Sequence, residues 1–150
     1  MKLLIAIDGS KASERALEKG LSLAAPTQSL VVLLTVVEPL SSYIPEVMMP
    51  TGDWVGLRGF PDIELEKKIL AAGQVILQKA EEACAAVNVQ SQTRLEMGLP
   101  RDVICQIVKD EAPDFLVIGS RGLGSVERLM LGSVSDYVIH HSSCAVVVVR

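Results

Sequence analysis

Aromatic residues are scarce in this sequence. They make up only 3% of the 150 residues, whereas apolar residues of all kinds make up 49%. Valine, leucine, isoleucine and alanine must therefore build the core, a mixture typical of parallel strands that lie beneath helices. A chain of this length is the size of one domain and can bury a sizeable core. We expect a single domain over residues 1–150.

The sequence also lacks a strongly basic run. The formal net charge is −4, which counts against binding to nucleic acid or to an anionic membrane surface. The apolar run at residues 3–7 is ended by Asp8 and is too short for a signal-peptide core or a membrane span. We therefore expect neither a nucleic-acid partner nor a membrane partner.

Cysteine and histidine are too few and too poorly spaced for a zinc site. The three cysteines are an odd number without a CxxC spacing, which indicates a reduced, cytoplasmic protein. The two histidines, His140 and His141, are adjacent and cannot share one metal ion at helical spacing. We expect His141 to be packed and His140 to be exposed, and we predict no metal-ligating residue.

Apolar runs alternate with helical periodicities along the chain. This alternation predicts an α/β fold with a parallel sheet and right-handed crossovers. Strands are predicted at residues 2–7, 30–37, 89–97, 114–118 and 145–149, and helices at 11–25, 63–87, from about Pro100 and after Gly132. The apolar stripe of the second helix is predicted to comprise Leu65, Ile69, Ala72, Ile76, Ala80, Ala83 and Val87.

Residues 38–61 interrupt this alternation. Prolines and glycines break any period there, and a connection of this length is a lid, a partner surface or a disordered crossover. Because it leaves the carboxyl end of the second strand, we expect it to be more mobile than the rest and to lie near the mouth of a pocket at that end.

A glycine pattern follows the fourth predicted strand. It reads Gly119-Ser-Arg-Gly122, then nine residues, then Gly132-Ser133 at the start of a helix. Glycines let backbone N–H groups approach an anion, and a helix N-terminus favours negative charge. The Ser133 hydroxyl could bind a phosphate or a metal, or it could be only the N-cap of the helix, with Asp136 three residues on. Gly-x-x-Gly alone also arises in ordinary turns.

This pattern resembles the ATP-binding signature of the universal stress protein family. The segment Ile5-Ala-Ile-Asp-Gly-Ser10 resembles the family's opening strand and aspartate turn, and Gly98-Leu-Pro100 and residues 144–150 resemble two further family segments. The resemblance covers nearly the whole chain apart from about residues 40–62. It implies a single doubly wound domain, Rossmann-like and of the adenine nucleotide alpha hydrolase-like type, with five parallel strands in the order 3-2-1-4-5.

The resemblance also implies a ligand, ATP alone or with Mg²⁺, and a set of residues around it. Gly119, Gly122, Gly132 and Ser133 would hold the phosphates. Asp8 would bind the base or the ribose, together with backbone near Ala6, Ile7 and Val36. Arg121 and Arg128 flank the loop and could pair with phosphate oxygens. The complete set of expected nucleotide-binding residues is Ala6, Ile7, Asp8, Val36, Ile118, Gly119, Arg121, Gly122, Gly132, Ser133 and Val134.

Alternatives to some of these roles are plain from the residues. Asp8 could be a turn residue that caps the first helix, and Arg128 could be an exposed charge. If the first and fourth strands are neighbours where the strand order reverses, Asp8 and Gly119 line one ligand site.

Three functions follow from this reading. The first is an ATP-binding regulator of the stress response with little or no hydrolysis and no catalytic residue. The second is a slow ATP hydrolase or phosphotransferase that uses Asp8 and a divalent metal. The third is an interaction module whose glycine loop is vestigial.

The last predicted strand, at residues 145–149, is apolar on both faces. In the order 3-2-1-4-5 it lies at a sheet edge that only Arg150 blunts, and an exposed apolar edge invites pairing with another chain. We expect a homodimer through this strand around a two-fold axis, as the resemblance also implies. The alternative is that a helix or the loop at residues 38–61 covers the edge within one subunit.

Overall fold

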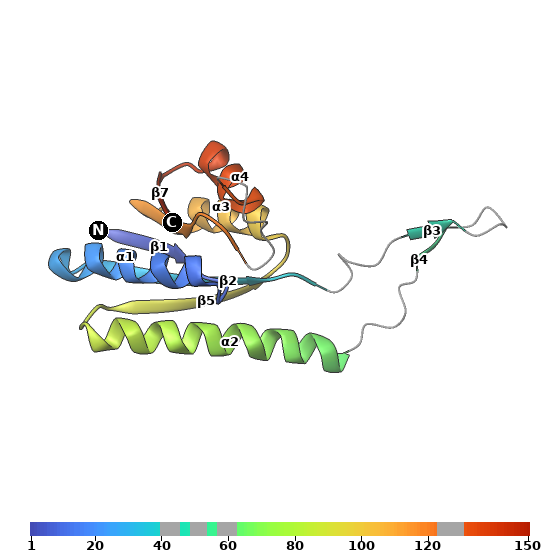
Figure 1. Cartoon of the computed structure of the whole chain (residues 1–150), viewed down its shortest axis with the longest axis horizontal. Coiled ribbons are helices and arrows are strands. Elements are labelled where there is room, and N and C mark those ends of the chain that lie inside the picture. Colours follow the sequence, from blue (N-terminus) through green and yellow to red (C-terminus); the bar gives the residue numbers. More distant parts are fainter. Residues whose placement is uncertain (40–45, 49–53, 57–62, 123–130) are drawn as a thin grey trace.

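The computed structural model describes residues 1–39, 46–48, 54–56, 63–122 and 131–150. Its elements alternate between strands and helices over most of the chain (Figure 1). In chain order they are β1 (Lys2–Ala6), α1 (Lys11–Thr27), β2 (Leu30–Val37), β3 (Glu46–Met48), β4 (Trp54–Gly56), α2 (Ile63–Ala86), β5 (Ser91–Met97), α3 (Pro100–Glu111), β6 (Phe115–Gly119), α4 (Ser133–His141) and β7 (Ala145–Val149).

Five of the strands form one parallel sheet in the order β5-β2-β1-β6-β7. When these five strands are numbered 1 to 5 in chain order, their order across the sheet is 3-2-1-4-5. The predicted doubly wound α/β topology is therefore confirmed. Ala6 of β1 lies opposite Leu34 of β2 and Ile118 of β6. The order reverses between β1 and β6, and the carboxyl ends of these two strands therefore lie side by side.

The central strands β1, β2 and β6 are buried on both faces, whereas the edge strands β5 and β7 are partly exposed. Along β1 the side chains alternate between two cores. Leu3 and Ile5 join the core cluster that contains residues of α1 and α2, such as Ala16 and Leu77. Leu4 and Ala6 join the cluster that contains residues of α3 and α4. Strands covered on both faces read as continuous apolar runs, which is why the sequence identified the central strands β1, β2 and β6.

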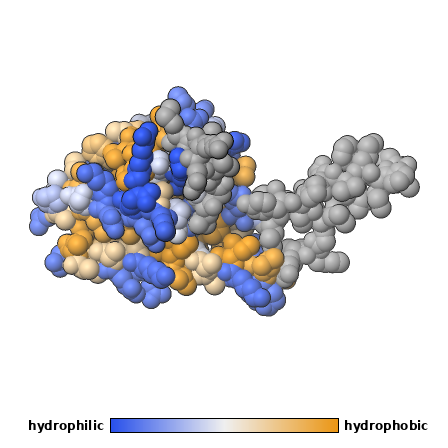
Figure 2. Space-filling view, viewed as in Figure 1, coloured by the Kyte–Doolittle hydropathy of each residue, from blue (hydrophilic) through white to orange (hydrophobic). Residues whose placement is uncertain are grey.

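The buried face of α2 matches the predicted stripe only in part, since Ala80 is buried and Ile76 and Ala83 pack against the core as predicted. Leu65 and Val87 are 40% and 45% exposed, and apolar side chains of α2 reach the surface among charged ones (Figure 2). The helix instead approaches the sheet through Gly73, where an added Cβ would lie 2.7 Å from Leu95 Cδ1. Apolar residues occur all round α2, so periodicity did not fix its orientation, whereas contact with β2 and β5 does. The residues buried by this contact are Gly73, Leu77, Ala80 and Cys84.

Two smaller expectations also need correction. α1 runs through Pro26 to Thr27 rather than ending at the proline, and within residues 38–61 the strands β3 and β4 pair antiparallel, so this segment is not a loop throughout. The rest of it, residues 40–45, 49–53 and 57–61, lies outside the described residues, so a lid near the pocket stays a prediction.

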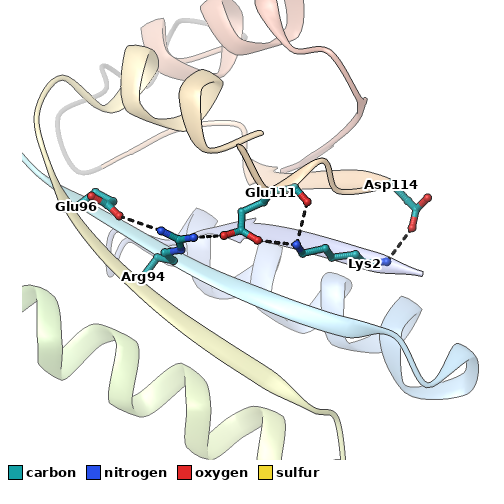
Figure 3. Close-up of polar contacts among 5 residues, drawn as sticks. All are labelled: Lys2, Arg94, Glu96, Glu111 and Asp114. Atoms are coloured by element: carbon teal, nitrogen blue, oxygen red, sulfur yellow. Dashed lines mark hydrogen bonds and ion pairs between the residues drawn. The ribbon is translucent and has the colours of Figure 1, made fainter. Parts of the chain in front are cut away.

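An ion network joins β1, β5 and α3 (Figure 3). The Glu111 carboxylate accepts a hydrogen bond from Lys2 Nζ at 2.5 Å and another from the Arg94 guanidinium. Arg94 also lies 3.7 Å from the Glu96 carboxylate, and the Lys2 backbone N–H donates to Asp114 Oδ2 at 2.8 Å. The hydrogen bond from Lys2, followed by that from Arg94, lowers the pKa of Glu111.

Candidate functional site

Asp8 lies two residues beyond β1, at the entry to α1. Its carboxylate Oδ1 accepts a hydrogen bond from Ser10 N–H at 3.0 Å, and Ser10 in turn caps α1 by accepting from Ser13 N–H. Gly9 between them has φ +80°, which glycine adopts without strain. Asp8 therefore does act as a turn residue, through its Oδ1 atom.

The second carboxylate oxygen of Asp8 faces the glycine loop. A Cβ built on Gly122 would lie 2.8 Å from Asp8 Oδ2. The two residues are 114 positions apart in the sequence and are brought together because β1 and β6 are neighbours in the sheet. A side chain at position 122 would push against the carboxylate, so the glycine keeps space beside it.

Close packing against α1 explains why position 119 is a glycine; access for a ligand is not needed to explain it. A Cβ at this position would meet the α1 backbone, 2.8 Å from Ala12 C and 3.0 Å from Ser13 N. Real Cβ atoms do not approach backbone so closely, so only glycine lets β6 lie against the first turn of α1. Its predicted phosphate contact stays a prediction.

Gly132 returns the chain to the end of β6. Its N–H donates to Ser120 O at 2.7 Å, and the Ser135 hydroxyl donates to the same oxygen at 3.0 Å. Gly132, not Ser133, is the N-cap of α4, so the capping alternative for Ser133 is wrong. Ser133 is the first helical residue and is exposed, which leaves its hydroxyl and N–H at the surface of the helix N-terminus.

Ser120 is a residue that the sequence did not single out. It is 5% exposed, and its N–H donates to Val149 O at 2.6 Å while its carbonyl accepts from Gly132 and Ser135. It therefore ties together the ends of β6, β7 and α4. The sequence feature that could have identified Ser120 is its position, as a small polar residue directly after a buried strand.

The other predicted site residues surround these. Arg121 is half-buried, with its Cα 3.3 Å from where a Gly132 Cβ would be. The backbone of Ile7 is already engaged, since its N–H donates to Leu34 O and its carbonyl accepts from Thr35 Oγ1. Arg128 lies outside the described residues. The side chains of Ala6, Ile7, Val36, Ile118 and Val134 all belong to or pack against the two cores.

The prediction that His141 is packed is wrong. His141 is exposed rather than packed in the core; its ring stacks on Tyr137 at 3.9 Å between centroids.

All three cysteines lie in the described part of the chain and are free thiols, and burial raises the pKa of Cys84 and Cys105. Among the described residues, no three His, Cys, Asp or Glu residues are grouped to hold a metal ion, and no helix is long and apolar enough to cross a membrane.

Comparison with known proteins agrees with this arrangement. The family profile described as the universal stress protein family matches residues 1–150. The chain belongs to this family. It is 33% identical to the universal stress protein YxiE of Bacillus subtilis, over 99% of this chain and 98% of that protein.

Two solved structures of similar fold contain an adenine nucleotide. A universal stress protein family protein of Arabidopsis thaliana with AMP bound is 28% identical, with a TM-score of 0.68 over 99% of this chain and 90% of that one. A universal stress protein in complex with cAMP is 23% identical, with a TM-score of 0.70 over 100% of this chain and 97% of that one.

Chemically, the switch point between β1 and β6 offers two contrasting groups. Asp8 supplies a carboxylate that can accept hydrogen bonds from hydroxyl groups. The start of α4 supplies backbone N–H groups and a positive dipole end that favour an anion. A ligand with hydroxyls at one end and phosphate at the other fits this pair of groups.

Proposed function

We propose that this universal stress protein binds an adenine nucleotide at the switch point between β1 and β6. In this proposal Asp8 accepts hydrogen bonds from the ribose or the base, and the residues from Gly119 to Ser133 hold the phosphates. ATP is the proposed nucleotide, alone or with Mg²⁺, and the protein acts as a cytoplasmic, nucleotide-dependent regulator of the stress response with little or no hydrolysis.

The observation that carries the proposal is the approach of Gly122 to Asp8. The 2.8 Å between the Asp8 carboxylate and the position of a Gly122 Cβ brings the carboxylate and the start of the glycine loop together at the switch point. The relatives described with AMP and cAMP support an adenine nucleotide as the ligand.

Isothermal titration calorimetry with AMP and ATP tests the proposal. Asp8→Asn keeps the size of the side chain and one acceptor oxygen but removes the charge. Because a hydrogen bond to a charged group contributes about 1.5–3 kcal/mol, we expect the dissociation constant to rise roughly tenfold or more. Gly122→Val places a branched side chain against the carboxylate and should weaken binding at least as much.

A matched control is Asp102→Asn, which makes the same chemical change on α3 at a side chain that is 51% exposed. It should bind nucleotide as the wild type does. Wild-type affinity in both Asp8→Asn and Gly122→Val, with folding intact, would refute the proposed site.

We also propose that two copies pair through β7. This strand is at the edge of the sheet, and its residues 146–149 are only half-buried although their side chains pack against both cores. Pairing with a second copy around a two-fold axis would cover the unpaired backbone groups of this apolar edge.

A further inference from the structure

Three of the seven arginines in the sequence surround one cavity of about 280 Å³. Among the described residues it is lined by Arg15, Ser120, Arg121 and Arg150. Every charged residue in this set is basic, although the whole chain has a formal net charge of −4. The described part of the cavity lining therefore carries a charge opposite to that of the whole protein.

The backbone explains why these arginines meet. Ser120 N–H donates to Val149 O at 2.6 Å, so the residues that follow these two, Arg121 and Arg150, leave the ends of neighbouring strands together. The close packing of Gly119 on Ala12 fixes α1 against the end of β6. Arg15 lies one helical turn after Ala12 and hence on the same side of α1.

The positive charges of Arg15 and Arg150 favour binding of an anion in this cavity. Arg15 and Arg150 are exposed, and neither forms an ion pair with any carboxylate in the part of the chain that the structure describes. Guanidinium groups stay charged at all accessible pH values, so Arg15 and Arg150 each bring a positive charge to the cavity that an anion could neutralise. Their planar forks of donors match the oxygens of a phosphate group, often through two hydrogen bonds each.

We propose that this cavity binds a phosphate-class polyanion of about the size of pyrophosphate. Its volume lies just below the range of about 300–1,000 Å³ that is usual for sites of drug-sized ligands, so a small anion suits it better than a whole nucleotide. The chemistry is shared by two sources, namely the terminal phosphates of a bound nucleotide and a free inorganic anion. The cavity borders the glycine loop through Ser120 and Arg121, but Arg15 and Arg150 lie outside the nucleotide site proposed above.

Calorimetric titration with sodium pyrophosphate tests the proposal on the full chain. The variants are Arg15→Gln and Arg150→Gln, which remove one charge each at exposed positions and should leave the fold intact by circular dichroism. The matched control is Arg101→Gln, since Arg101 is 54% exposed on α3 and is not part of the cavity lining. We expect each cavity variant to weaken pyrophosphate binding about tenfold or more, and the control to leave it unchanged.

Titrations with nucleotide present distinguish the two sources. If saturating AMP leaves pyrophosphate affinity unchanged and ATP does not compete, the anion is a separate ligand. If ATP competes with pyrophosphate and the preference for ATP over AMP falls in the arginine variants, the cavity holds the nucleotide's own terminal phosphates. Both results support the proposal.

Two results would overturn it. One is equal pyrophosphate affinity in the wild type and both cavity variants. The other is no binding of pyrophosphate at millimolar concentration together with an unchanged preference for ATP over AMP in the variants. Wild-type AMP affinity in Asp8→Asn and Gly122→Val would refute the nucleotide site alone, so the two proposals fail separately.

Discussion

Replacing Glu111 with glutamine should destabilise the fold more than the same change at an exposed glutamate. Glutamine keeps the shape of the side chain but removes the charge that holds Lys2 and Arg94 together (Figure 3). The Glu111 side chain is 11% exposed, so water replaces little of what is lost.

The size of the effect follows from the exposure of the partners. Breaking a fully buried ion pair costs about 3–5 kcal/mol because the remaining charge stays unpaired. The side chains of Lys2 and Arg94 are 29% and 44% exposed, so both can recover hydration. We therefore expect a loss of about 2–3 kcal/mol, in the upper part of the range of about 1.5–3 kcal/mol for hydrogen bonds to charged groups. For a domain of this size that corresponds to a fall in Tm of roughly 4–12 °C.

Thermal unfolding followed by circular dichroism as a function of pH measures this effect. The pKa of Glu111 is lower in the folded protein than its ordinary value of 4.5. The carboxylate therefore contributes its stability fully above about pH 4.5 and loses it as the pH falls through the lowered pKa. The difference in Tm between the wild type and Glu111→Gln should be largest near neutral pH and should shrink as the medium is acidified below that point.

Glu64→Gln provides the control. Glu64 lies 3.9 Å from Lys67 on the surface of α2, and the side chains of the pair are 79% and 70% exposed, so its contribution should be below about 0.5 kcal/mol. If Glu111→Gln lowers the Tm at neutral pH no more than Glu64→Gln does, the network adds nothing beyond an ordinary surface pair and the reasoning is wrong.

Three further predictions follow from the glycine loop, the sheet edge and Asp8. Gly119→Ala should cost about 1–3 kcal/mol of stability, because its Cβ meets α1 backbone at 2.8 Å, whereas Gly132→Ala, with a nearest contact of 3.3 Å, should cost less; equal shifts in thermal unfolding would contradict this. Because the Val149 carbonyl accepts from Ser120, residues 147 and 149 pair with β6 and the backbone N–H of Val148 faces the free edge. Val148→Pro removes this donor and should convert the proposed dimer to a folded monomer by light scattering, and a monomeric wild type at micromolar concentration would rule out the dimer. In single-turnover assays with ATP and Mg²⁺ we expect little or no hydrolysis; turnover that is lost in Asp8→Asn would favour the hydrolase alternative instead.

The sequence by itself predicted the α/β class because strands buried on both faces must be apolar throughout, whereas the strand order 3-2-1-4-5 was implied by the family resemblance. Continuous runs such as Leu30–Val37 can be read without knowing their neighbours, and the alternation with helices then restricts the topology. α2 shows the limit of this reasoning. Its apolar residues occur on several faces, so only the close approach of Gly73 to Leu95 determined which face is buried.

The glycine spacing likewise marked where a loop and a helix start meet, but it gave each glycine the same role. Tertiary structure separated them, since Gly119 makes room for α1, Gly122 makes room for the Asp8 carboxylate, and Gly132 caps α4. The cavity between Arg15, Arg121 and Arg150 has no local pattern at all. Its residues come from one helix and the ends of two strands, and side chains this far apart in sequence become neighbours only when the sheet and helix pack, which no short-range periodicity encodes.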